Sequence, residues 1–104
     1  MELKVTPSIG DTPLSEEEIR ADLEEEQQLR VYRWSNGPDD EYASHTHGYH
    51  KIIYVLAGTI RFDLPTRHEV LNLKVGDRLD LPSGIRHSAV VGPEGVTCLE
   101  AHIY

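Results

Sequence analysis

The chain has 104 residues, of which 38% are hydrophobic and 27% charged, so it can form one small core but not two, and its single cysteine excludes an internal disulfide. Its formal net charge is −8 and it has no basic stripe, which argues against nucleic acid as a partner. The longest apolar stretch, 52–57, is too short to span a bilayer, and the first residues do not resemble a signal peptide, so we expect a cytoplasmic protein with no membrane partner.

The N-terminal segment carries most of the negative charge, with nine acidic and three basic residues in the first thirty positions. Ser15 followed by three glutamates, the last of them Glu18, is typical of a capping box at a helix start. Apolar residues then recur at helical spacing, which predicts a helix over 16–28. We expect residues 1–28 to form an extension and a short helix packed on the outside of the remaining chain.

From residue 29 onward apolar and polar residues alternate with the period of a β-strand. Gly58 is expected at a hairpin or bulge, and the segment 92–95 at a connecting turn. Many short strands between regularly spaced turns indicate an all-β barrel over 29–104. Because such a small barrel has open strand edges, we expect a homodimer, with the strand at 29–34 as the shared surface. The predicted strands cover 31–34, 42–47, 50–57, 59–64, 69–73, 78–81, 87–91 and 96–103.

Two short motifs carry the chemistry. The first is His45-Thr46-His47, in which the two histidines share one face if the segment is a strand. The second has the pattern G-x5-P-x-G-x2-H and runs from Gly76 to His87. A third imidazole at His87 would complete a face of three nitrogen ligands. Such a face suits a divalent transition metal, and iron, manganese, zinc or nickel would accept it.

These motifs resemble the two signatures of the cupin superfamily. The resemblance is strongest over 45–91, and the strand pattern from 29 to 104 fits a whole cupin barrel. It implies a cupin jelly-roll β-barrel with a short N-terminal helix, and a metal held by His45, His47 and His87. Cupin relatives include dioxygenases, isomerases and decarboxylases of small organic molecules. It therefore implies a metal-dependent enzyme of dioxygenase or isomerase type, or a non-catalytic module that binds or senses a small-molecule ligand.

The chain departs from the cupin pattern at Lys51, where the family has a glutamate ligand. An ammonium group has no lone pair to offer a metal. The site therefore has either three histidines with open positions, or His50 in the vacated place. Regular pleating sends His50 to the opposite face, although a turn at Gly48 could reset that register. If Lys51 points inward, it pairs with Glu100 or grips an anionic substrate; otherwise its long stem reaches solvent.

Side chains on the last strand add further candidates. Cys98, Glu100 and His102 share one face of it, and this face either lines the barrel or leaves Glu100 and His102 in solvent. Tyr49 is a candidate for the pocket wall. The candidates for contact with substrate are therefore Lys51, Glu100, His102 and Tyr49, whereas the turn residue His68 is expected at the surface.

Overall fold

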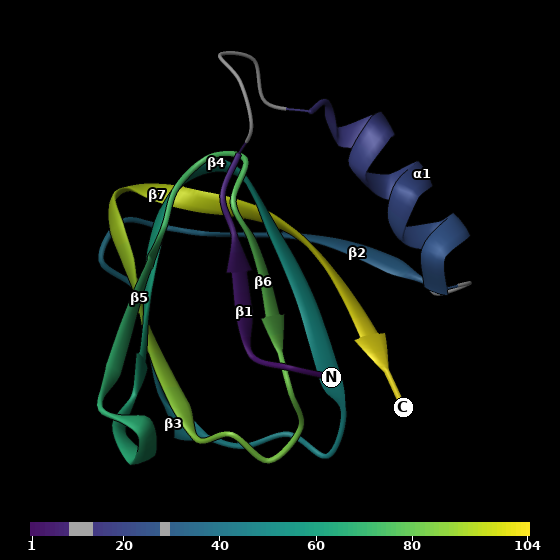
Figure 1. Cartoon of the computed structure of the whole chain (residues 1–104). Coiled ribbons are helices and arrows are strands. Elements are labelled where there is room, and N and C mark those ends of the chain that lie inside the picture. Colours follow the sequence, from purple (N-terminus) through teal and green to yellow (C-terminus); the bar gives the residue numbers. More distant parts are fainter. Residues whose placement is uncertain (9–13, 28–29) are drawn as a thin grey trace.

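The computed structural model, shown in Figure 1, describes residues 1–8, 14–27 and 30–104. The prediction of an all-β fold with one short helix is confirmed, and none of the helices in these ranges is long and apolar enough to cross a membrane. The elements are β1 (Lys4–Thr6), α1 (Glu16–Gln27), β2 (Val31–Asn36), β3 (Glu41–His45), β4 (His50–Leu64), the short 3-10 helix η1 (Pro65–Arg67), β5 (Glu69–Leu73), β6 (Arg78–Leu81) and β7 (His87–Ile103).

The barrel is organised around two long antiparallel strands, β4 and β7, which pair with each other along most of their length. The first half of β4 pairs with β6, and β6 pairs in turn with β1. The second half of β7 pairs with β2. Beyond the bend in each strand, β4 pairs with β5 and β7 pairs with β3. The long strands thus pass from one layer of the barrel into the other, as Figure 1 shows, and this arrangement is a jelly roll.

A corner built from glycines lets both long strands bend without breaking. Gly58 in β4 has φ 75° and lies opposite Val96, where the register shifts by a bulge. A Cβ at Gly58 would lie 1.9 Å from the carbonyl oxygen of Gly95, so only glycine fits there. The bulge predicted at Gly58 is therefore present and the hairpin alternative is wrong. The predicted break at 92–95 is also wrong, because β7 runs through it as one strand whose pairing with β4 shifts register between Val91 and Val96.

Two apolar clusters hold the barrel together, one on each face of the sheet. Alternate residues of β4 and β7 supply them: Cys98 belongs to the inner cluster and Leu99 to the outer. The inner cluster fills the barrel and includes Ile53, Val55, Ile60, Phe62, Leu64, Leu73, Leu79, Leu81, Ala89, Val91 and Val96. The outer cluster lies between the sheet and the helix and includes Ile19, Leu23, Val31, Ile52 and Ala101.

The helix α1 packs on the outside of the barrel, against β2 and β7 (Figure 1). Its capping box is formed: the Glu18 amide donates to Ser15 Oγ at 3.1 Å, and the Ser15 amide to Glu18 Oε1 at 3.4 Å. Its own apolar residues Ile19 and Leu23 are buried against the sheet. The helix begins at Glu16 and ends at Gln27; the predicted last residue, 28, lies outside the described residues. The helix thus covers the part of the outer sheet face that carries the outer cluster.

Candidate metal centre

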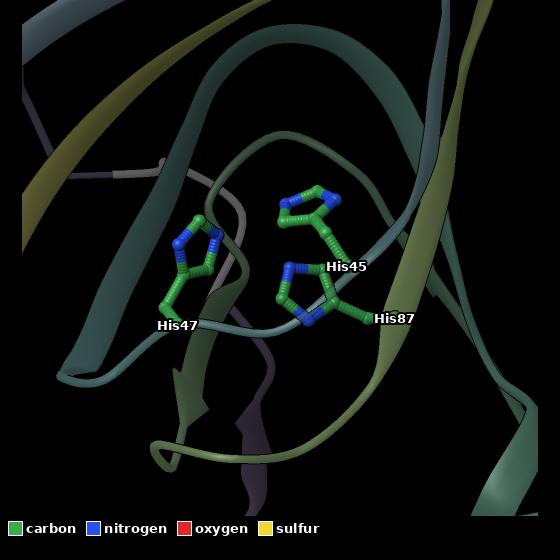
Figure 2. Close-up of side chains that lie close together, drawn as sticks. All are labelled: His45, His47 and His87. Carbon is green, nitrogen blue, oxygen red and sulfur yellow. The ribbon is translucent and has the colours of Figure 1, made fainter.

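Three histidines meet inside one end of the barrel, as Figure 2 shows. His45 is the last residue of β3 and pairs directly with His87, the first residue of β7. The strand predicted over 42–47 ends early, so His47 reaches the group from the turn that follows. The ring centroids are 4.6 Å apart for His45 and His47, 4.5 Å for His45 and His87, and 5.3 Å for His47 and His87. One ring nitrogen of each lies within 4.8 Å of the others.

Backbone carbonyl groups fix the tautomers of two of these rings. His45 Nδ1 lies 2.6 Å from the Ala43 oxygen, and His87 Nδ1 lies 2.9 Å from the Ile85 oxygen. A carbonyl oxygen only accepts, so each Nδ1 carries the proton and each Nε2 keeps its lone pair. His47 Nε2 is buried and has no hydrogen-bond partner among the described residues. This unpaired nitrogen, beside two oriented rings, is what a metal ligand set requires.

The surroundings keep two of the imidazoles neutral. Burial, helped by the Lys51 ammonium and the other two histidines, lowers the pKa of His47 to about 4. Burial also lowers the pKa of His87, although its hydrogen bond to Ile85 opposes this shift. Neutral imidazole is the form that binds a metal. The histidine group therefore fits a divalent transition metal, with three nitrogen donors and open coordination positions.

A cavity of about 280 Å³ adjoins the three histidines. Its charged residues are Lys51 and Glu100, and most of its wall is apolar or aromatic. The sequence motifs did not identify Trp34 and Tyr42 as part of this wall. The alternation along β4 and β7 is the signal that could have identified the apolar part of the wall. The full lining is Trp34, Tyr42, His45, His47, Lys51, Ile53, Ile60, Phe62, His87, Ala89 and Glu100.

Lys51 points into the barrel and pairs with Glu100. The Lys51 Nζ to Glu100 Oε2 distance is 3.4 Å, and the two side chains are 14% and 11% exposed. Glu100 lies opposite Ile53 across the β4–β7 ladder, which makes Lys51 its diagonal neighbour. Trp34 is the diagonal neighbour on β2, and its Nε1 donates to Glu100 Oε1 at 3.2 Å. Of the two orientations considered for Lys51, the structure shows the inward one.

The other predicted site residues lie outside the group of three histidines. The Ser83 amide donates to His50 Nδ1 at 2.9 Å, so a neutral His50 carries its proton on Nε2 and has no lone pair left for a metal. His102 hydrogen-bonds Glu100 through Nε2 and stacks on Tyr49 with centroids 4.3 Å apart. Both lie next to the cavity rather than in its lining. His68 is exposed at the end of η1, as predicted.

Comparisons with known proteins agree with this fold. The family model of the AraC-like ligand binding domain matches residues 28–102. No curated protein matches the chain significantly. A RmlC-like cupin from Shewanella frigidimarina NCIMB 400 superposes with TM-score 0.63 at 21% identity, over 72% of this chain and 65% of that one. This similarity supports the fold alone.

Two structures of named enzymes are also similar. The polyketide cyclase RemF from Streptomyces resistomycificus is 25% identical with TM-score 0.64, over 71% of this chain and 54% of the cyclase. The DMSP lyase DddQ from Ruegeria pomeroyi is 25% identical with TM-score 0.65, over 73% of this chain and 38% of the lyase. The similarity thus spans about half of the cyclase and less of the lyase. The family match covers most of this chain, which therefore belongs to the AraC-like ligand binding domain family and has a cupin fold.

Proposed function

We propose that this protein binds one divalent transition metal through His45, His47 and His87 and presents it to a small organic molecule in the adjoining cavity. The observation that carries this proposal is the convergence of the three imidazoles, two of them oriented by backbone carbonyl groups. The third has a buried Nε2 with no partner in the described part of the chain. Iron, manganese, zinc and nickel all suit this ligand set.

The neutral ligand set favours an enzyme. A bound divalent metal would supply Lewis acidity, and three neutral imidazoles leave its full charge uncompensated. The protein's own groups orient the histidines, and the apolar wall of the cavity limits water around the ligand. The similarity to a cyclase and a lyase points the same way. We therefore propose an enzyme of dioxygenase or isomerase type acting on a small molecule.

The second candidate is a module that binds or senses a small molecule without converting it. Lys51 occupies the position where the cupin pattern has a fourth ligand, and the family is defined by ligand binding. Turnover separates the two functions. Oxygen consumption by the iron-loaded protein during turnover of a small organic substrate would identify a dioxygenase. Conversion of the substrate without oxygen consumption would identify an isomerase. Saturable binding with no conversion would identify the sensing module.

The metal content of the purified chain tests the proposal. We expect a near-stoichiometric metal in the wild type and in His68→Asn, whose exposed left-handed position tolerates asparagine. His45→Ala should lose the metal, whereas His50→Ala should retain it. Equal metal content in His45→Ala and His68→Asn would contradict the assignment.

We also propose that the protein acts as a homodimer that associates through β2. This strand lies at the end of the sheet path, with β7 on one side. Tyr32, the second residue of this strand, is 44% exposed, which is unusual for a large aromatic side chain within a strand.

A further inference from the structure

Lys51 is a cation held in a nearly buried position beside the three histidines. Its side chain is 14% exposed, and it lines the same cavity as the imidazoles. A buried ammonium is costly unless it is paired. Its partner in the structure is Glu100, at 3.4 Å. This distance is longer than the roughly 2.7–2.9 Å of a strong charge-assisted hydrogen bond. The contact is therefore one that a better-placed anion can replace.

Glu100 does not depend on Lys51 for its hydrogen bonds. Trp34 Nε1 donates to its Oε1 at 3.2 Å, and His102 Nε2 hydrogen-bonds its Oε2. Lys51 has three N–H donors. It can therefore turn one or two of them toward a ligand while the carboxylate of Glu100 stays hydrogen-bonded in place.

The charge balance of the cavity decides which ligand enters. With the histidines neutral, Lys51 and Glu100 cancel each other. A divalent metal then adds two positive charges that no other residue of the lining offsets. Apolar side chains such as Ile60 and Phe62 screen charge poorly, so the metal-loaded cavity attracts an anion. A carboxylate fits better than a phosphate. The carboxylate carries one negative charge and the phosphate up to two, and Lys51 offers a single ammonium group to pair with it.

We infer that Lys51 is the specificity-determining residue of the cavity and that the ligand is a small carboxylate with an apolar body, an inference that rests on the proposed metal site. The carboxylate group lies between the metal and the ammonium, and the body packs on the aromatic wall. At about 280 Å³ the cavity is near the lower end of small-molecule pockets, which span roughly 300–1,000 Å³.

Benzoate and benzamide test this inference, because they share a ring and differ in charge. Calorimetric titration of the zinc-loaded full chain compares the wild type with Lys51→Gln, Lys51→Arg and the control Lys74→Gln, whose lysine is 71% exposed. We expect Lys51→Gln to bind benzoate roughly 10- to 100-fold more weakly, the factor that one charge-assisted hydrogen bond is worth, with benzamide unchanged. Lys51→Arg keeps the preference for benzoate, and Lys74→Gln behaves as the wild type.

Zinc uptake, measured on the same samples, separates this inference from the proposed function. Equal benzoate binding by the wild type and Lys51→Gln, with zinc bound in both, overturns the inference and leaves the metal site standing. A wild type that takes up no zinc contradicts the metal site instead. The benzoate comparison on the zinc-free protein then tests Lys51 alone, and no difference between the two proteins overturns its role. Circular dichroism of each variant verifies that the barrel is folded.

Discussion

Two residues of the candidate metal centre repeat one local geometry. His45 and His87 each bring Nδ1 to the carbonyl oxygen of the residue two positions earlier, Ala43 and Ile85. The two histidines are also paired across β3 and β7, so the same local arrangement occurs on both sides of one ladder. The backbone therefore orients these rings without any second side chain, which makes their orientation independent of the surrounding sequence.

The acid sensitivity of the metal-free protein follows from His47. Its pKa is about 4 in the folded state against an ordinary 6.5, so between these values the unfolded chain binds more protons at this residue. The contribution of neutral His47 to stability is complete above pH 6.5 and falls as the pH decreases toward 4. Chemical denaturation of the metal-free protein across this range should show the loss. His47→Gln should lose less of its free energy of unfolding over the same pH range. An equal dependence of the unfolding free energy on pH in both proteins would contradict the assignment.

Cys98 should be chemically inert in the native protein. Its side chain is completely buried, and burial raises the pKa of its thiol to about 12. We expect an aromatic disulfide reagent to leave the folded protein unmodified at pH 8 and to react quickly once denaturant unfolds it. Fast reaction under native conditions would mean that the inner cluster opens readily.

The spacing of the histidines sufficed to predict which of them meet, but not how. His45, His47 and His87 follow from the two motifs, yet the end of β3 at His45 depends on pairing with β7, which no local pattern reveals. Regular pleating favoured opposite faces for His50 and Lys51, but the alternative of a register reset at Gly48 left His50 open as a ligand. The orientation of Lys51 depended on its diagonal neighbour Glu100, forty-nine positions away in the sequence. Contacts of this kind arise only once the strand register is set.

At the scale of elements, the glycine corner determines the shape of the barrel. Turn-forming residues at 92–95 predicted two strands where the structure has one, because the strand bends there and its ladder with β4 shifts register and then resumes. Gly58 and Gly95 both have positive φ and meet across β4 and β7. A local sequence pattern cannot distinguish a paired corner from a turn, since both use the same residues.

Gly58→Ala should therefore destabilise the barrel strongly. The new Cβ would lie 1.9 Å from the Gly95 oxygen, at a φ of 75°. We expect a loss of about 2–4 kcal/mol in the free energy of unfolding, combining left-handed strain with overpacking. Gly48→Ala is the control, because nothing lies within 4 Å of its Cβ position. Urea denaturation of the metal-free protein measures the stability of both variants. Similar unfolding midpoints for Gly58→Ala and Gly48→Ala would show that the corner tolerates a side chain at Gly58.

At the scale of the whole molecule, the open edge at β2 bears on assembly. The proposed homodimer associates there, so its dissociation should be sensitive to a charge introduced at an exposed side chain of this edge strand. Light scattering should give twice the chain mass at micromolar concentration, and Tyr32→Glu should shift the equilibrium toward monomer. Tyr104→Glu, at a position 90% exposed beyond β7, is the control. A monomer mass for the wild type across this concentration range would refute the dimer.

The central claim is that three imidazoles hold the metal, and X-ray absorption at the zinc edge of the zinc-loaded protein tests it most directly. The account predicts three imidazole nitrogens at about 2.0–2.1 Å, with oxygen atoms from water completing the shell. It also predicts one fewer imidazole in any zinc that His87→Ala retains. A shell with fewer than three imidazoles in the wild type, or one that His87→Ala leaves unchanged, would contradict it.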